Sequence, residues 1–390
     1  ARPFSACFRI AMIWLSVNLD CFIAELSSSM VENSTSDPVY LQGVLPNQMR
    51  KITIVFCLVR YKQGNKALGE STEFDYWVKP LEELGHSIFI FEIDRFLQGP
   101  QLSNSIDDGS LYDFSKSVNA DWVFLNDYTN LGISAETWKK IADSGIYTSC
   151  WFGDDNHKYD DYTKYKAHNF THPITCDHFS LGRYRYDNLP KPILSQWGAD
   201  NYPRHLSAQD YDYDISFVGV YSPYRHFILN QLNKLGYKVA FFGEGWPNGS
   251  LTQNEMFDVF HRSKINLSLE KLSTNYDLRY LLMFPKKLGS FFKDLIFKRP
   301  IIQKQIKKRP FDIAIAKGFQ LVEYVPFIEE YFDLKTELKV FTTIDELIFF
   351  VNHFLNNEEH RLNYIESAFK KTIQQHTMRS RLENVIKKIF

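Results

Sequence analysis

From residue 51 onward, short apolar runs alternate with longer amphipathic stretches along the chain. The runs at residues 51–59 (KITIVFCLV) and 213–219 (YDISFVG) have the length and the Val, Ile and Phe content of buried strands. The stretch at residues 71–84 reads as a helix and is followed by Gly85, a common helix end. Alternation of this kind is typical of parallel βα units, in which helices cover both faces of a sheet. The pattern therefore predicts an α/β fold.

Two series of such units follow one another. The first predicts strands at residues 51–59, 87–93, 121–126 and 146–152, and helices at residues 71–84 and 135–143. The second predicts strands at residues 213–219, 238–243, 264–269 and 319–323, and helices at residues 223–235, 253–261, 311–316, 344–355, 358–374 and 378–390. A proline-containing passage without helical period, residues 187–208, separates the two series. We therefore predict two Rossmann-like domains, residues 49–200 and 201–390, that face a ligand-binding cleft.

Residues 1–48 lack this alternation. Their apolar stretch, residues 10–24, is interrupted by Asn18 and Asp20, and it is shorter than the roughly 20 residues that span a bilayer. No clean small-residue cleavage site precedes the polar run that follows, so the stretch does not fit a signal peptide. We therefore expect these residues to be a poorly ordered extension, with the natural start at Met49, and we expect a cytoplasmic protein.

Composition and charge narrow the function classes. The 390 residues suit two domains, and 45 Lys and Arg against 46 Asp and Glu give a formal net charge of −1. This balance excludes the global charge of a dedicated nucleic-acid binder, so no nucleic-acid partner is expected. A hydrophobic content of 44% with 23% charged residues excludes a largely disordered chain. The five cysteines are scattered without a C-x-x-C pair, as in proteins whose thiols stay reduced.

The neutral total hides one block, residues 276–309, that is basic and apolar at once. This composition suits an interfacial helix in peripheral contact with the inner face of the membrane. It also suits a surface that binds an anionic acceptor. A helical insertion that packs on its own domain, with its lysines in solvent, explains the block equally well.

Two glycine-containing turns follow strands of the second series. Gly219 precedes a helix that carries Arg225, so that backbone, helix N-terminus and guanidinium can together meet a phosphate. Gly243 and Gly245 follow the next strand and leave room for a planar base or a sugar, with Trp246 as a wall. A simple turn with a packed tryptophan accounts for this second motif equally well. Neither turn is a G-x-G-x-x-G fingerprint or a P-loop, so ordinary dinucleotide-binding and NTPase functions lose support.

A carboxylate lies at the start of the helix expected at residues 311–316. Pro310 suits a first helical turn, and Asp312 lies near the positive end of the helix dipole. A carboxylate held there can accept hydrogen bonds from ribose hydroxyls. The alternative is that Asp312 is no more than a first-turn helix charge.

In the first series, residues 151–155 (WFGDD) follow a strand. Asp154 and Asp155 are therefore candidates for a general base that takes a proton from an acceptor hydroxyl. A solvated acidic loop is the alternative, because Asp160 and Asp161 follow closely.

No metal site is predicted. A carboxylate site at Asp154 and Asp155 would need a third oxygen ligand at a defined spacing, and the sequence offers none. Zinc-binding residue types lie nearby at His168, His172, Cys176 and His178. Pro173 interrupts the helix that would align the first three of them, so ordinary loop and core positions explain this group better.

One long run resembles a known family. Residues 309–332 (RPFDIAIAKGFQLVEYVPFIEEYF), together with residues 337–341 and the tail at 356–386, resemble the carboxyl-terminal signature of the CgeB-like glycosyltransferases. That family is similar to family 4 of the GT-B glycosyltransferases. Its pattern R-x-F-E-x-x-A-x-G-G-F is matched with Asp312 in place of Glu and Lys317 in place of the first Gly. The segments at 214–219, 243–246 and 262–267 keep the family's order, and W-x-x-D-D occurs in it as well.

The resemblance implies a GT-B-like fold that binds a nucleotide-sugar donor in its carboxyl-terminal domain without a metal. It implies that Asp312 binds the donor ribose and that Gly219 faces the diphosphate. Arg225 and Arg309 would be basic residues near that diphosphate, and Gly243 and Gly245 would lie by the base. The first glutamate of the family 4 E-x7-E motif would fall at Lys304, so a carboxylate of the family is missing there.

The function implied by the resemblance is metal-independent transfer of a sugar from a nucleoside-diphosphate donor to a glycan, lipid or protein acceptor, without a cofactor. The missing carboxylate keeps a catalytically inactive glycosyltransferase-like scaffold as one alternative. A non-enzymatic bilobal ligand-binding protein is the other, since two βα domains around a cleft also serve binding alone.

Overall fold

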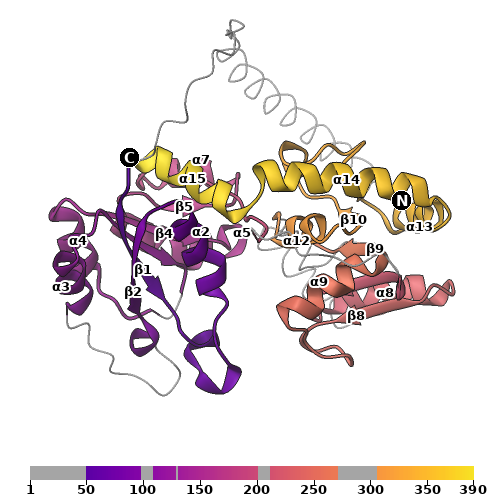
Figure 1. Ribbon diagram of the computed structural model, residues 1–390, viewed down its shortest axis with the longest axis horizontal. Coiled ribbons are helices and arrows are strands. Elements are labelled where there is room, and N and C mark those ends of the chain that lie inside the picture. Colours follow the sequence, from indigo (N-terminus) through magenta and orange to yellow (C-terminus); the bar gives the residue numbers. More distant parts are fainter. Residues whose placement is uncertain (1–49, 98–108, 129–130, 201–210, 271–304) are drawn as a thin grey trace, which may run out of the picture. The chain divides into compact units, whose positions relative to one another are not determined.

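The computed structural model describes residues 50–97, 109–128, 131–200, 211–270 and 305–390 (Figure 1). All of these except Arg50 belong to one compact unit, Lys51–Phe390. The expected extension at residues 1–48, the expected start at Met49 and the basic block up to residue 304 lie outside the described residues. In the part of the chain that is described, no helix is both long and apolar enough to cross a membrane.

The first half builds a parallel sheet on residues 53–194. Its strands lie in the order β2 (Ser87–Glu92), β1 (Thr53–Leu58), β3 (Trp122–Asn126), β4 (Tyr147–Phe152), β5 (Ile174–Thr175) and β6 (Ile193–Leu194). Its α-helices are α2 (Lys79–Glu83), α3 (Ser110–Ser117), α4 (Ala135–Asp143), α5 (Asp155–Lys158), α6 (Lys164–Lys166) and α7 (Ser180–Tyr186). Short 3-10 or π-helical turns are η1 (Lys62–Gly64), η2 (Lys66–Leu68), η3 (Phe74–Val78), η4 (Asp94–Phe96), η5 (Tyr159–Thr163) and η6 (Ala167–Asn169).

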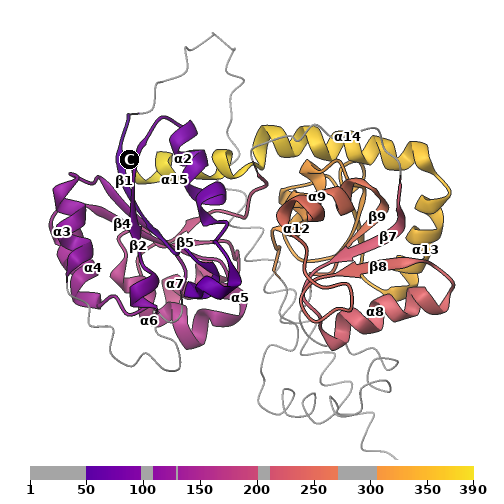
Figure 2. The ribbon, with the colours of Figure 1, turned by 60° about the horizontal axis from the view of Figure 1, so that its bottom comes forward.

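Alternating residues of β1 explain how this sheet is covered on both faces. Val55 and Cys57 belong to the same hydrophobic core as residues of α3 and α4. Phe56 points to the opposite face and packs against Trp77 of η3, which leads into α2. Figure 2 shows α3 and α4 on one side of the sheet and α2 on the other.

The second half builds a second parallel sheet, and all its strands follow residue 212. They lie in the order β11 (Lys339–Phe341), β10 (Gln320–Glu323), β9 (Ser263–Ser268), β7 (Tyr213–Val218) and β8 (Val239–Phe242). The helices that follow these strands are α8 (Pro223–Lys234), α9 (Gln253–His261), α12 (Arg309–Ile315), η7 (Ile328–Glu330), α13 (Ile344–Leu355), α14 (Glu358–Gln375) and α15 (Met378–Ile389).

The side chains of β7 again alternate between two cores. Ile215 and Phe217 pack with α8 and α13, whereas Val218 packs with α9 and α12. Both layers are visible around the second sheet in Figure 2. The two parallel sheets, each covered by helices, confirm the predicted α/β fold class.

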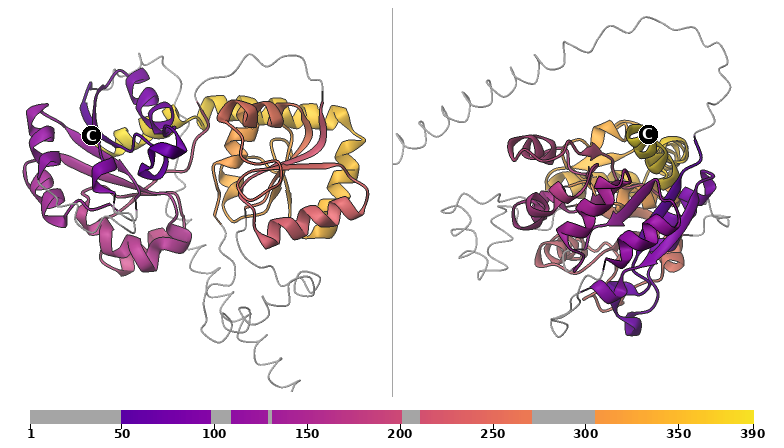
Figure 3. Two further views of the ribbon diagram at one scale, coloured as in Figure 1. Left: turned by 90° about the horizontal axis from the view of Figure 1, so that it is seen from below. Right: turned by 90° about the vertical axis from the view of Figure 1, so that its left-hand side faces the viewer.

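The chain returns to the first half near its end. The backbone of Ala199 donates to His376 O at 2.8 Å and accepts from Met378 N at 2.8 Å, so that the segments around residues 199 and 377 run side by side. The last helix, α15, then packs against α2 (Figures 1 and 3). The domain boundary at residue 200 stays a prediction, because α15 follows the second sheet in sequence but contacts the first half.

Several local expectations change. The helix expected at residues 71–84 begins as the π-helical turn η3 and becomes α-helical only in α2. The alternation did not predict α3, α5 to α7, β5, β6 or β11. Strands of two or three residues carry no readable period, and α3 (SLYDFSKS) spans only eight residues, which is shorter than the window over which a helical period is read.

The crossing at residue 199 yields a stability prediction. A Cβ added at Gly198 would lie 2.6 Å from the backbone nitrogen of Met378, so Gly198→Ala forces two backbones apart. We expect it to lower the free energy of unfolding by about 2 kcal/mol, measured by urea denaturation. Gly182→Ala is the matched control, because an added Cβ within α7 meets nothing and replaces a helical glycine. It should raise stability by about 0.5 kcal/mol, and equal effects of the two changes would contradict this reading.

Candidate functional site

A pocket of about 460 Å³ lies at the carboxyl ends of β7 and β9, where α8 and α12 begin. Parallel α/β sheets bind ligands at this edge. A pocket of about 580 Å³ lies at the opposite edge, beside the first residues of β7 and β8, and is therefore the weaker candidate. The residues of the first pocket used below are Gly219, Arg225, Glu270, Lys307, Arg309 and Asp312.

The guanidinium of Arg225 is held in place by main-chain oxygens. Ser222 caps the start of α8 and accepts a hydrogen bond from the Arg225 backbone. Arg225 Nη1 donates to Val220 O at 2.8 Å, and Nη2 donates to Leu269 O at 3.0 Å. Its Nε is buried without a hydrogen-bond partner, and burial lowers the pKa of the group. An anion in the pocket would offer Nε an acceptor and would add to the counter-charge that Glu270 and Glu323 already provide.

Asp312 is buried in the first turn of α12, with only 2% of its surface exposed. Lys308 Nζ lies 3.5 Å from Asp312 Oδ1, and Arg309 Nη1 lies 3.5 Å from Oδ2. Oδ1 accepts no hydrogen bond. Burial raises the pKa of this carboxyl, although both cations oppose the shift. The site therefore contains a carboxylate oxygen that can accept a hydrogen bond from a hydroxyl group.

Both cations beside Asp312 are also held by aromatic rings. Lys308 Nζ lies 4.0 Å from the ring centre of Tyr76, which belongs to the first half. The Arg309 guanidinium lies 5.3 Å from the ring centre of Phe260. The π faces favour the positive charges and help to keep them at the pocket, where Lys308 also lies 3.8 Å from Asp200 Oδ1.

A second buried carboxylate, Glu270, lies in the same pocket and was missed by the sequence reasoning. It accepts hydrogen bonds from Ser268 Oγ and, at 2.9 Å, from Lys307 N. Burial raises its pKa, while Arg225 and Lys307 counteract the shift. The available signal was its position two residues after β9, the same distance from a strand end as that of Asp154 after β4.

The glycines of the second series have different surroundings. Gly219 lines the pocket, but Gly243 and Gly245 are not among its lining residues. Gly243 has φ +129°, and a Cβ there would collide with the carbonyl of Gly219. Trp246 is buried and donates from Nε1 to Gly219 O at 2.8 Å. Around this turn, Gly243 and Trp246 lie against the backbone of Gly219, whereas Gly245 lies against Tyr221, and no contact with a base or sugar follows from their positions.

The two adjacent carboxylates after β4 lie in different environments. Asp155 is fully buried and accepts hydrogen bonds from the hydroxyls of Thr163, Thr175 and Tyr184 at 2.6, 2.6 and 3.2 Å. Asp154 is partly exposed and forms an ion pair with Lys307, with Nζ 2.9 Å from Oδ1. Only Asp154 is therefore connected to the pocket that Arg225 and Asp312 line.

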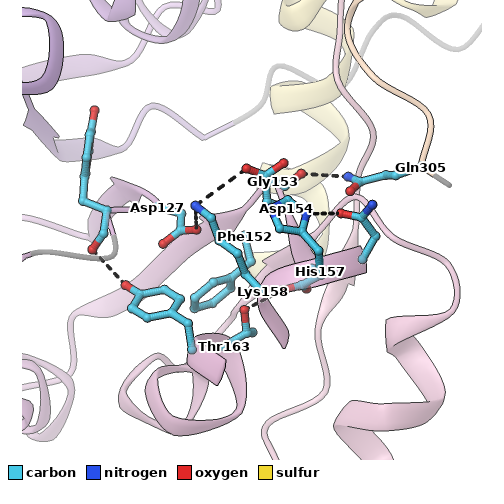
Figure 4. Close-up of polar contacts among 12 residues, drawn as sticks. Asp127, Phe152, Gly153, Asp154, His157, Lys158, Thr163 and Gln305 are labelled. Atoms are coloured by element: carbon cyan, nitrogen blue, oxygen red, sulfur yellow. Dashed lines mark hydrogen bonds and ion pairs between the residues drawn. The ribbon is translucent and has the colours of Figure 1, made fainter. Parts of the chain in front are cut away.

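Asp154 belongs to a short chain of charges at the carboxyl ends of β3 and β4. Lys158 Nζ lies 3.6 Å from Asp154 Oδ2 and 3.7 Å from Asp127 Oδ2 (Figure 4). Burial raises the pKa of Asp127 to about 6, against the effect of Lys158. Burial also acts to raise the pKa of Asp154, but Lys307, His157 and Lys158 hold it below its ordinary value. Asp127 follows a strand directly, which is the signal that would have identified it from the sequence.

Two members of the histidine and cysteine group of the first half, Cys176 and His178, are used in packing, whereas His168 is exposed. Cys176 is buried and its Sγ contacts Gly153 O at 3.1 Å, while the ring of His178 stacks on Phe327 at 4.3 Å. Within the described ranges, no set of three or more His, Cys, Asp or Glu side chains is arranged to hold a metal ion.

Comparison with known proteins adds to this geometry. Residues 225–387 match the family described as glycosyl transferase-like. Among solved structures, the chain is similar to an alpha-glucosyltransferase in complex with UDP-glucose and DNA containing an abasic site (TM-score 0.58, 10% identity, 87% of this chain, 99% of that one). It is also similar to a glycosyltransferase from Rickettsia africae ESF-5 (0.56, 13%, 87% and 99%) and to sucrose-phosphate synthase from Thermosynechococcus elongatus (0.55, 8%, 87% and 99%). The fold is that of the GT-B glycosyltransferases.

The match begins at Arg225 and includes four of the five strands of the second sheet, at whose carboxyl edge the pocket lies. No curated protein matches the sequence.

The environment of Asp155 predicts a specific pH dependence of stability. Burial raises the pKa of Asp155 to about 7, above its ordinary 3.8, despite three hydrogen bonds that oppose the shift. As pH rises from about 4 to about 7, the unfolded carboxyl releases its proton while the folded one retains it, so this group makes the folded state progressively less favoured. Asp155→Asn cannot undergo this loss. Between pH 4 and pH 8, its free energy of unfolding should therefore rise relative to that of the wild type by up to about 4 kcal/mol.

Urea denaturation of both proteins across that pH range measures the difference. Asp161→Asn serves as the control, because Asp161 is exposed on the next helical turn and its replacement should leave the pH profile unchanged. Parallel profiles for the wild type and Asp155→Asn would contradict the prediction.

Proposed function

We propose that this protein transfers a sugar from a nucleoside-diphosphate-sugar donor to a hydroxyl group of a glycan, lipid or protein acceptor. The observation that carries the proposal is Arg225, whose guanidinium is fixed at the carboxyl edge of the second sheet with a buried, unpaired Nε. The glycosyl transferase-like match and the likeness to a fold seen with UDP-glucose support the same conclusion.

The donor's diphosphate would lie beside Arg225, Lys308 and Arg309, in front of the N-terminus of α8. When the bond between the anomeric carbon and the phosphate oxygen breaks, its electron pair leaves with the diphosphate. Fixed guanidinium and ammonium groups stabilise that charge without having to reorganise. We therefore propose that transfer proceeds without a metal ion, and that the nucleotide sugar is the only small molecule required besides the acceptor.

Asp312 would hold the donor through the ribose. Its Oδ1 is buried without a hydrogen bond, and hydroxyl groups are the donors that a nucleotide presents to such an oxygen. The position of Asp312 within residues 309–332 also supports membership of the CgeB-like group, whose signature those residues resemble.

Asp154 would assist the acceptor. It is the partly exposed member of the carboxylate pair, and Lys307 connects it to the pocket. As general base it would take the proton from the acceptor hydroxyl while that oxygen bonds to the anomeric carbon. Asp155 is buried among hydroxyl groups, so we assign it a structural role.

Donor binding and hydrolysis test this function. UDP-, GDP- and ADP-sugars are screened for thermal stabilisation of the purified protein, followed by release of the free nucleoside diphosphate. Arg225→Met and Asp312→Asn should each weaken binding of the stabilising nucleotide by about tenfold to a hundredfold, since the first removes a charged donor and the second replaces a charged acceptor with a neutral one.

Arg262→Met is the matched control, because Arg262 pairs with Asp212 near the opposite end of the sheet. It should leave nucleotide binding unchanged, and far-UV circular dichroism checks that all three variants fold. The function is refuted if no nucleotide stabilises the wild type, and the assignment of the pocket is refuted if Arg225→Met binds normally.

A further inference from the structure

Lys307 connects the proposed donor pocket to Asp154 in the first half of the chain. It lines the pocket, and its ammonium lies 2.9 Å from Asp154 Oδ1 and 3.3 Å from Gln305 Oε1. We propose that Lys307 is a positioning residue that binds Asp154 while the pocket is empty and turns to the diphosphate when the pocket is filled, releasing Asp154 for the acceptor. This proposal rests on the proposed function.

The backbone around Lys307 is anchored, so that only its side chain needs to move. Gln305 Nε2 donates to Gly153 O at 2.7 Å, a contact drawn in Figure 4. The backbone nitrogen of Lys307 donates to the buried carboxylate of Glu270 at 2.9 Å. The side chain itself retains 25% exposure. A flexible four-carbon chain on a fixed backbone can exchange one anion for another without a change in the fold.

The pocket provides a reason for that exchange. Arg225 and Arg309 are further cations of the pocket, and Arg309 lowers the pKa of Arg225 because the two positive charges disfavour each other. A diphosphate relieves that repulsion and carries more charge than one carboxylate. An ammonium at the rim of the pocket is therefore drawn from Asp154 toward the incoming anion.

The charges around Asp154 define what its release would do. Lys307 is the first of the three cations that hold its pKa down, before His157 and Lys158. Lys158 is shared with Asp127, so it neutralises Asp154 only in part. After Lys307 leaves, Asp154 becomes a stronger base at the moment when a donor is present. Lys307 would thereby favour binding of the donor before abstraction of the acceptor proton.

A double-mutant cycle on anion binding tests the link. Pyrophosphate and UDP are titrated calorimetrically into the full chain and into Asp154→Asn, Lys307→Met and the double variant. In the proposal, Asp154 and the bound anion compete for Lys307. Asp154→Asn removes one competitor, so it should tighten pyrophosphate binding by about fivefold or more. In the Lys307→Met background the same Asp154→Asn change should alter binding by less than about twofold.

Lys158→Met is the matched control. Lys158 also pairs with Asp154 but does not line the pocket, so Asp154→Asn should still tighten pyrophosphate binding in that background. If Lys307→Met lowers the unfolding midpoint, Lys307→Gln replaces it in the cycle. The rate of transfer provides a second test. With an accepted donor supplied below saturation, Lys307→Met should move the acidic limb of the pH–rate profile to higher pH.

Each outcome decides between the alternatives. If Asp154→Asn tightens binding equally with and without Lys307, Asp154 repels the anion directly and the exchange is refuted. If pyrophosphate and UDP bind but Asp154→Asn has no effect, the exchange is refuted while the proposed function stands. If the wild type binds neither, both fail.

Discussion

The burial of charge at the carboxyl ends of β7 and β9 is the constraint on which the rest of the site depends. A charged group taken out of water needs counter-charges or hydrogen bonds, and the chain supplies them incompletely in this pocket. Asp312 retains an oxygen without a hydrogen bond, and Arg225 retains a nitrogen without one. Glu270, in contrast, has partners on both oxygens. The two atoms without a hydrogen bond, Asp312 Oδ1 and Arg225 Nε, are therefore the points at which the proposed ligand would complete the polar contacts of this pocket.

Segments from both halves of the sequence meet around this constraint. Tyr76 places its ring under Lys308 and donates its hydroxyl to Gly198 O, so that the aromatic contact and the chain crossing share one residue. Gln305 reaches the carbonyl of Gly153. The polar network therefore continues from the pocket into the loop after β4, where Asp154 lies. An ion pair in this place is a poor source of stability but a good means of coupling two sites.

Periodicity predicted the regular elements well where an element is long and one of its faces is buried. The helices at residues 135–143, 253–261 and 344–355 have the bounds that the pattern predicts, because each buries an apolar stripe against a sheet. Strand-end reasoning and the family resemblance led to Gly219, Arg225, Arg309 and Asp312, all of which line one pocket. The same reasoning could not tell which of Asp154 and Asp155 is buried. Both follow the same strand, and the direction in which each side chain points depends on the folded loop.

Local period and turn chemistry were enough to predict the α/β class, the two series of parallel units and the basic and acidic groups at the strand ends. Which of those groups face one another follows only from the folded chain. Asp155 is enclosed by hydroxyls from η5, β5 and α7, and Lys307 reaches an aspartate about 150 positions away in the chain. Burial and pairing depend on contacts between distant segments, so they cannot be derived from the order of residues along one of them.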